Sequence, residues 1–226
     1  MTFTTSVSAA IDAKVAARSM LSHPFYQAWT DGTLPLDTLR QYARQYFHHV
    51  EAFPTAVSAV HSNCPDRAGR RMLAENLAEE EGIEAGKQDH ASLWMMFACG
   101  LGETETAVRE QALNDETRAL IDTFRRLSRK SYASGLGALY AYESQFPGVA
   151  KAKIEGLEER YGVADEKTLR FFRVHEVADV EHSEVCRDLL NKLPQAEQAE
   201  AAAAGEELAG ALWGFLSGVQ RESVIH

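Results

Sequence analysis

Two histidines and an aspartate share one helical face in the stretch HEVADVEH, residues 175–182. His175, Asp179 and His182 are separated by steps of four and then three residues. At about 100° per residue, these steps bring the three side chains to one narrow stripe of an α-helix. Apolar residues normally pack on such a stripe. The spacing therefore predicts a metal site inside a helical bundle, in which other helices supply the remaining ligands. The alternative is that a histidine caps or pairs and that Asp179 is a solvated charge.

The rest of the chain also shows helical patterns. No alternating run of β-branched residues between tight-turn dipeptides indicates a strand. Apolar residues recur at helical spacing, and Pro54 and Pro147 fall inside or beside helical stretches, where they can kink a helix. The predicted helices span residues 6–21, 36–62, 66–82, 90–100, 114–133, 136–161 with a break near Pro147, 165–191 and 203–220.

These patterns predict an all-α fold, a compact bundle of seven or eight helices. No linker rich in glycine, serine or proline interrupts the first 190 residues, so residues 1–226 are expected to form a single domain. The stretch 194–207 is rich in alanine and glutamate and short of core residues. We interpret it as a mobile connector before the last helix.

Composition restricts the classes of partner. A formal net charge of −10 argues against a nucleic-acid partner, because phosphate binding needs a basic surface. No apolar stretch approaches the roughly 20 residues that span a bilayer, and the N-terminus lacks the pattern of a signal peptide. The three cysteines form neither an even framework nor a CxxC pair, which is typical of reduced thiols. We expect a cytoplasmic protein without a membrane partner.

Other helices offer further ligands for the site. The run Glu79–Glu81 in NLAEEEG is followed by His90. Glu143 lies among apolar and aromatic residues in LYAYESQF, where a carboxylate is costly to bury unless it is paired or bound to a metal. The alternative for the glutamate run is a solvated face, which suits one or two of its members.

The ligand types indicate the class of metal. Three carboxylates and three imidazoles without a thiolate suit iron or manganese. Six side chains are more than one tetrahedral ion can use, but they suit two metal ions that share a bridging carboxylate. The spacing is not the Glu-x-x-His pattern of ferritin-like bundles, so a different bundle is expected. Of the adjacent His48 and His49, at most one can face the site, and we expect it to line the cavity or support a ligand.

Seven motifs occur in order between residues 20 and 220. They are HPFYQAW, QYARQYFHHVEAFP, SAVHSNC, NLAEEEG, LYAYESQFPGVAKAKIEGL, HEVADVEH and LWGFL. In this combination the chain resembles the family of the Chlamydia protein associating with death domains, within the heme-oxygenase-like dimetal oxidases. The resemblance implies a heme-oxygenase-like bundle. That fold is shared with relatives of the thiaminase TenA and of the pyrroloquinoline quinone synthase PqqC, which lack this metal set.

The resemblance also implies an activity. Members of this family resemble self-sacrificing synthases of para-aminobenzoate, the folate precursor. An oxygen-activating centre of two irons, or of iron and manganese, oxidises one of the protein's own tyrosines and uses an external electron donor. The resemblance implies that Tyr26 is the consumed tyrosine and that Lys153 gives the amino nitrogen, in a protein that turns over once. A homodimer follows from the resemblance alone. The implied metal ligands are Glu80, His90, Glu143, His175, Asp179 and His182.

The choice of glutamate ligand stays open. The chain carries a few extra residues between the glutamate run and His90, compared with the family pattern. Counting forward from the start of NLAEEEG selects Glu80, whereas an unbroken helix back from His90 favours Glu79. Gly82 and Gly86 make an unbroken helix doubtful, so Glu80 is our prediction and Glu79 is kept in reserve.

The choice of lysine also stays open. Lys151 and Lys153 are two residues apart on a helix and face different ways, and spacing alone does not say which one turns inward. Burial would lower the pKa of a lysine facing the site and favour the neutral, nucleophilic amine.

Three other functions compete with the synthase. The same metals could serve a conventional oxygenase or oxidase that acts on a small exogenous substrate. A TenA-like hydrolase would use no metal, and a helical interaction module that binds death domains would not be an enzyme. The last two functions leave the converging ligand-type residues without an explanation.

Overall fold

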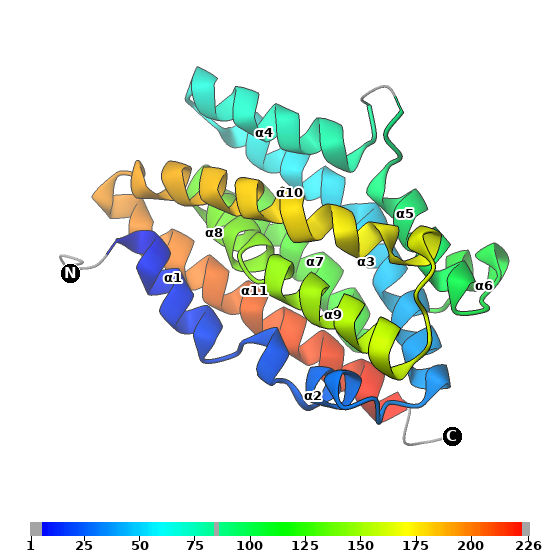
Figure 1. Ribbon diagram of the computed structural model, residues 1–226. Helices are drawn as coiled ribbons and strands as arrows, with labels where there is room; N and C mark the ends of the chain where they lie inside the picture. Colours follow the sequence, from blue (N-terminus) through cyan, green and yellow to red (C-terminus); the bar gives the residue numbers. More distant parts are fainter. Residues whose placement is uncertain (1–5, 84–85, 223–226) are drawn as a thin grey trace.

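The computed structural model describes residues 6–83 and 86–222 and shows a bundle of α-helices (Figure 1). Across these residues there are eleven α-helices, one short 3-10 helix and no strand, which confirms the all-α prediction. The elements are α1 Val7–Ala16, η1 Met20–Ser22, α2 Pro24–Thr30, α3 Leu36–Asn63, α4 Arg67–Glu80, α5 His90–Gly100, α6 Glu105–Arg109, α7 Asp115–Lys130, α8 Tyr132–Glu143, α9 Phe146–Arg160, α10 Glu166–Asn191 and α11 Gln195–Glu222.

The helices are more numerous than the predicted seven or eight because short elements add to the long ones. α2 has seven residues and begins at a proline, whose preceding histidine accepts a hydrogen bond from the Phe25 backbone N–H. α6 has only five residues, too few for a periodic pattern in the sequence to stand out. The predicted break near Pro147 is confirmed: α8 ends at Glu143, and α9 starts with Pro147 in its first turn, where a proline costs no hydrogen bond.

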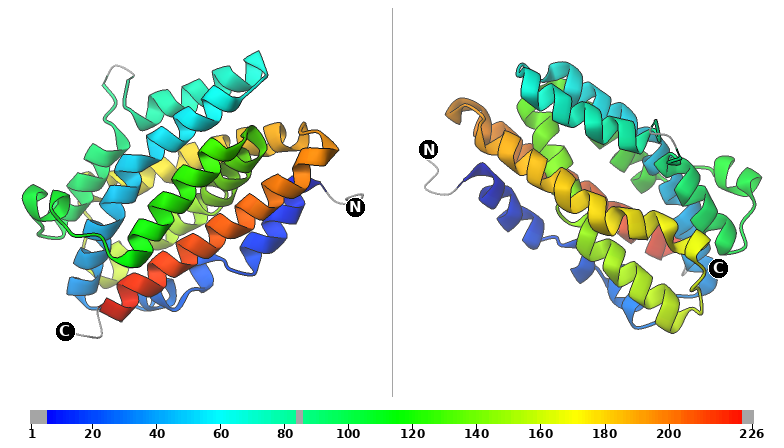
Figure 2. Two further views of the ribbon diagram at one scale, coloured as in Figure 1. Left: turned by 180° about the vertical axis from the view of Figure 1, so that it is seen from behind. Right: turned by 45° about the horizontal axis from the view of Figure 1, so that its top comes forward.

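The helices pack around α8, in which every residue from Ala133 to Glu143 is buried. The long helix α10 crosses the bundle in yellow in Figure 1 and packs against α9, α5 and α8. α11 runs the length of the bundle beside α7 and α1, as seen from behind in Figure 2. α4 folds back along α3 at the edge of the bundle. Among the described residues, no helix combines the length and the apolar character needed to cross a membrane.

Residues 195–207, predicted to lie before the last helix, form the first part of that helix. α11 begins at Gln195 and continues without interruption to Glu222. Its small residues are buried because α8 approaches closely: a Cβ added at Gly137 would lie 2.1 Å from the carbonyl oxygen of Ala201. The alanines that resembled a linker in composition are therefore the residues that allow two helices to pack at short range.

Aromatic side chains fill the centre of the bundle. Trp29, Tyr42, Trp94 and Phe172 are completely buried, and they come from α2, α3, α5 and α10. The indole N–H of Trp94 donates to the backbone carbonyl of Ala43 at 2.8 Å, so this polar group is satisfied inside the core.

The contact between α8 and α11 generates a stability prediction. We expect Gly137→Ala to lower the free energy of unfolding by about 1–3 kcal/mol or more, because the new methyl group would collide with the backbone of α11. Gly214→Ala on α11 is the matched control: its Cβ would meet nothing within 4 Å, so the variant should gain up to about 1 kcal/mol from helix propensity. Urea denaturation followed by circular dichroism measures both values, and equal effects would contradict the close approach.

Candidate metal centre

The structure brings the six predicted ligands to one buried region. Each belongs to a helix that points it inward, and none is more than 7% exposed. They are Glu80 at the end of α4, His90 at the start of α5, Glu143 at the end of α8, and His175, Asp179 and His182 along α10. Burial of so many ionisable groups is costly unless they neutralise one another or bind cations.

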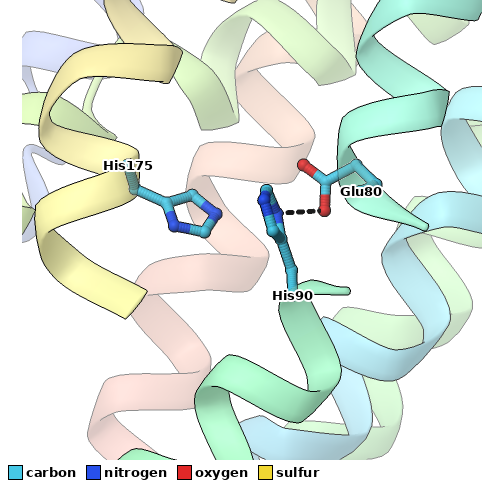
Figure 3. Close-up of side chains that lie close together, drawn as sticks. All are labelled: Glu80, His90 and His175. Carbon is cyan, nitrogen blue, oxygen red and sulfur yellow. Dashed lines mark ion pairs between the residues drawn. The ribbon is translucent and has the colours of Figure 1, made fainter. Parts of the chain in front are cut away.

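Three of the six form a close cluster (Figure 3). Glu80, His90 and His175 each offer one ligand atom, and these atoms lie within 4.8 Å of one another. The Nδ1 atom of His90 is 2.6 Å from Oε2 of Glu80. Two histidines and one carboxylate are the donor set of non-heme iron(II) oxygenases. The cluster therefore has the chemistry expected for binding of a redox metal.

His175 is oriented by its own helix. Its Nδ1 lies 2.7 Å from the backbone carbonyl oxygen of Phe171, and because a carbonyl only accepts, Nδ1 carries the proton. The other ring nitrogen, Nε2, is then free to bind a metal, which is the usual arrangement for a ligating histidine. Burial, with the neighbouring His90, lowers the pKa of His175 well below its ordinary value, so the imidazole is in the neutral form that ligation requires.

Asp179 and His182 form the adjoining part of the site. Nδ1 of His182 is 3.5 Å from Oδ1 of Asp179, and its Nε2 is 3.2 Å from Oε2 of Glu79. Burial raises the pKa of Asp179 to about 7. Burial disfavours the charged form of His182, but the nearby carboxylates of Asp179, Glu143 and Glu80 outweigh it and raise the pKa to about 9. These groups hold protons that a bound cation would displace.

Glu143 is held by two neighbours that the sequence interpretation did not identify as partners. Its Oε1 accepts a hydrogen bond from Nδ2 of Asn76 at 2.8 Å, and its Oε2 accepts one from Sγ of Cys186 at 3.1 Å. Burial raises the pKa of Glu143. Asn76 lies four residues before Glu80 and Cys186 four residues after His182. Helical spacing from the predicted ligands is thus the signal that could have identified both.

Buried polar atoms without partners test whether the site fits a metal. Nδ1 of His90, Oδ2 of Asp179 and Nδ1 of His182 are buried and make no hydrogen bond. The short distance from His90 to Glu80 lacks hydrogen-bond geometry. Buried polar atoms are nearly always satisfied, so these atoms need a partner that the chain does not provide. Nitrogen and oxygen donors without thiolate suit iron or manganese, and the residues present fit such ions.

The turn after α4 explains the position of the two glutamates. α4 ends at Glu80, and Gly82 adopts a left-handed backbone with φ of 61°, so no continuous helix leads to His90. Glu80 is 3% exposed and faces His90, whereas Glu79 contacts His182 at the edge of the site. The count along an unbroken helix, which favoured Glu79, does not apply to this chain.

Tyr26 and Lys153 lie together in the aromatic core. Tyr26 on α2 is 3% exposed and Lys153 on α9 is fully buried. The Nζ atom of Lys153 is 5.6 Å from the centroid of the Tyr26 ring. The side chain of Lys151 is 65% exposed and points to Glu155, so Lys153 is the lysine that turns inward. Burial lowers the pKa of Lys153 well below its ordinary value and favours the neutral amine.

One aromatic residue separates Lys153 from the metal-ligand cluster. The Phe146 ring centroid is 5.2 Å from Nζ of Lys153 and 5.2 Å from the ring centroid of His175. Phe171 also stacks on His175, at 4.0 Å between centroids. Lys153, which lies beside Tyr26, and the predicted ligand His175 are therefore both neighbours of Phe146.

His49 is the inward-facing member of its pair, but it lies against tyrosines and not among the six residues. It is 1% exposed and packs on Tyr46 and Tyr142, at 5.0 and 5.3 Å between centroids. Its Nε2 has no hydrogen-bond partner, and burial lowers its pKa to about 3. His49 is thus a neutral side chain that lines the core beside the site.

Comparisons with known proteins agree with this geometry. Residues 40–214 match the family described as iron-containing redox enzymes. The chain is 39% identical to the 4-aminobenzoate synthase of Nitrosomonas europaea, over 92% of this chain and 89% of that protein. Its fold is similar to a CADD-like protein of unknown function from Nostoc punctiforme (TM-score 0.77, 19% identity, 96% and 94% covered). It is also similar to a TenA homologue from P. horikoshii (TM-score 0.78, 14% identity, 96% and 99% covered). The heme-oxygenase-like, TenA-like fold is confirmed.

The clustered ligands generate a metal-binding prediction. Iron(II) or manganese(II), added without oxygen, should raise the thermal midpoint, because the ion binds the folded state only. We expect His175→Ala and Asp179→Ala each to raise the Kd for the metal by about 100-fold or more, measured by equilibrium dialysis with metal analysis. Glu181→Ala, on the exposed face of the same helix, is the control and should bind metal like the wild type. Unchanged binding in all three variants would contradict the site.

A second prediction concerns Cys186. Because its thiol donates to Glu143, Cys186→Ala should raise the metal Kd by about 10-fold, as loss of a group that orients a ligand does. Cys64 is similarly buried, but its thiol lies near the carbonyl of Asp66, so Cys64→Ala should leave metal affinity unchanged. The same dialysis measurement compares the two variants, and equal affinities would mean that Cys186 only fills space.

Proposed function

We propose that this chain, which belongs to the family of iron-containing redox enzymes, is a 4-aminobenzoate synthase that uses its own side chains as substrate. Relatives of that name share more than a third of its residues over most of its length. The observation that carries the proposal is the pairing of Tyr26 with Lys153 in the buried aromatic core, where Lys153 and the predicted ligand His175 share the neighbour Phe146.

The product explains why these two side chains matter. 4-Aminobenzoate is a benzene ring with a carboxylate and an amine at opposite positions. A tyrosine side chain is the same ring with a methylene carbon and an oxygen at those positions. Conversion requires that the Cα–Cβ bond of the tyrosine breaks and that molecular oxygen oxidises the methylene carbon to the carboxylate. It also requires that a nitrogen, freed from its own carbon, replaces the phenolic oxygen. We infer that Tyr26 provides the ring and that Lys153 provides the nitrogen.

The state of Lys153 supports its role as nitrogen donor. A buried ammonium would need a compensating anion, whereas Nζ of Lys153 is hydrogen-bonded to the hydroxyl of Tyr42. Burial keeps the amine neutral, which leaves its lone pair available for bond formation. The surrounding rings exclude water, so the amine has no competitor from solvent.

The six buried ligands would hold two metal ions, either two irons or iron with manganese. When bound, ions of this kind activate molecular oxygen with electrons from an external donor. The buried rings of Phe146 and Phe171 pack on the predicted ligand His175 and shield it from solvent. A protein whose own residues are consumed can complete only one turnover.

An exogenous substrate is the main alternative for the same metals. It would need room beside His175, and Phe146 and Phe171 already pack on that ring. Lys153 lies next to Phe146, so this side of His175 is lined by the chain's own side chains. A metal-free hydrolase or an interaction module would leave the buried cluster of carboxylates and imidazoles unexplained.

The experiment is mass spectrometry of the protein before and after reaction. We expect incubation with iron or manganese, a reductant and oxygen to yield no more than one 4-aminobenzoate per chain and to change the masses of the peptides that contain Tyr26 and Lys153. Tyr26→Phe and Lys153→Met should give no product. Lys151→Met is the matched control, because this lysine is exposed, and it should give the wild-type yield.

Two outcomes would contradict the proposal. Product that accumulates while both peptides keep their mass would show that the ring and the nitrogen come from elsewhere. A Tyr26→Phe protein with wild-type oxidation activity would point to an exogenous substrate.

A further inference from the structure

The hydroxyl group of Tyr42 lies between Lys153 and Tyr26. Nζ of Lys153 donates to Oη of Tyr42 at 2.6 Å, and the same oxygen is 3.2 Å from Oη of Tyr26. All three side chains are buried. The lysine and the proposed substrate tyrosine are therefore joined through one shared oxygen atom of a third residue.

A phenolic hydroxyl can serve both neighbours at once. It has one proton to donate and lone pairs that accept. When Tyr42 accepts from the Lys153 amine, its own proton remains available for the oxygen of Tyr26. A neutral amine that donates through one N–H keeps its nitrogen lone pair unoccupied. The shared hydroxyl thus holds the amine without blocking the atom that has to form a bond.

The ring of Tyr42 is fixed by its surroundings. It is fully buried and contacts rings on several sides, including Phe25 at 5.2 Å, Tyr46 at 5.5 Å and Trp29 at 5.7 Å between centroids. A close-packed side chain has little freedom to change rotamer. Its hydroxyl is consequently a fixed point, to which the long and otherwise flexible lysine side chain is tied.

The amine has little else to orient it. Six aromatic rings surround Nζ of Lys153, with centroids between 4.9 and 5.6 Å away. Rings limit the space but offer a neutral amine no strong directional acceptor. The hydroxyl of Tyr46, one turn further along α3, forms a hydrogen bond with the hydroxyl of Tyr142 at 2.9 Å. Tyr42 is therefore the tyrosine on α3 whose hydroxyl orients Lys153.

We propose that Tyr42 is a positioning residue: its hydroxyl holds the Lys153 amine and the Tyr26 phenol side by side and is not itself consumed. The bridge, which runs from Nζ of Lys153 through Oη of Tyr42 to Oη of Tyr26, is present in the folded chain. Its role in the reaction rests on the proposed function. Preorganised geometry of this kind contributes to rate because the reacting groups need no further search for one another.

The first test monitors the environment of the Lys153 amine by NMR, in the full-length protein before metal is added. Lysine labelled with ¹³C at Cε gives NMR signals, and the Lys153 signal is identified by its loss in Lys153→Met. In Tyr42→Phe, which keeps the ring and removes the hydroxyl, we expect the chemical shift of the Lys153 signal to change. In Tyr46→Phe, a buried tyrosine on the same helix, we expect it to stay in place.

The second test measures the rate of product formation and identifies the residues that the product comes from. With metal, reductant and oxygen, Tyr42→Phe should form product about 10- to 100-fold more slowly than the wild type, and the product should still come from Tyr26 and Lys153. Tyr140→Phe is the control for loss of a tyrosine hydroxyl, because that hydroxyl bonds Asp12 on α1 and not the site. It should react at the wild-type rate.

The proposal is overturned if Tyr42→Phe leaves both the Lys153 signal and the rate within about twofold of the wild type, or if peptide masses show that residue 42 itself loses its ring. If the variant does not fold, a crystal structure of the wild type decides. Tyr42 Oη beyond about 3.5 Å from Lys153 Nζ or Tyr26 Oη would break the bridge. A wild type that consumes neither residue refutes the proposed function alone, since the lysine signal still tests the bridge.

Discussion

The cost of removing charge from water governs the organisation of this protein. Three carboxylates, three imidazoles and one amine lie inside a helical bundle, each nearly or fully buried. In such surroundings a group must be neutral, hydrogen-bonded or bound to a cation. The fold meets this demand by bringing the ends of α4, α5 and α8 to the middle of α10, so that groups from separate helices compensate one another. The amine lies apart from the carboxylates and is neutral instead.

The predicted metal ligands and the lysine amine lie in two different environments. Phe146 touches both the His175 ring and the surroundings of Lys153, and so it divides a polar compartment from an aromatic one. The first compartment holds the predicted metal ligands. The second holds Lys153, whose pKa is lowered by burial, beside phenol groups. The predicted ligand His175 and the amine therefore share a single aromatic neighbour, Phe146.

Much of this could be predicted from the sequence, wherever one helix carried the information. The three ligand-type residues of α10 followed from their spacing, and the break before α9 followed from Pro147. Features that depend on two helices could not be read in this way. The position of Glu80 depends on the left-handed turn at Gly82, and the orientation of Lys153 depends on how α9 packs. The alanine-rich start of α11 lacked large apolar residues because α8 lies too close to admit them.

The deep burial of Tyr26 has a consequence for the fate of the molecule. A chain that gives up this ring loses its contacts with Phe25 and Trp29 and keeps a hole in its own core. Voids left by lost aromatic side chains cost about 3–5 kcal/mol, a large share of the roughly 5–15 kcal/mol that keeps a domain folded. If Tyr26 is consumed as proposed, the reacted protein would therefore unfold more readily than the unreacted one.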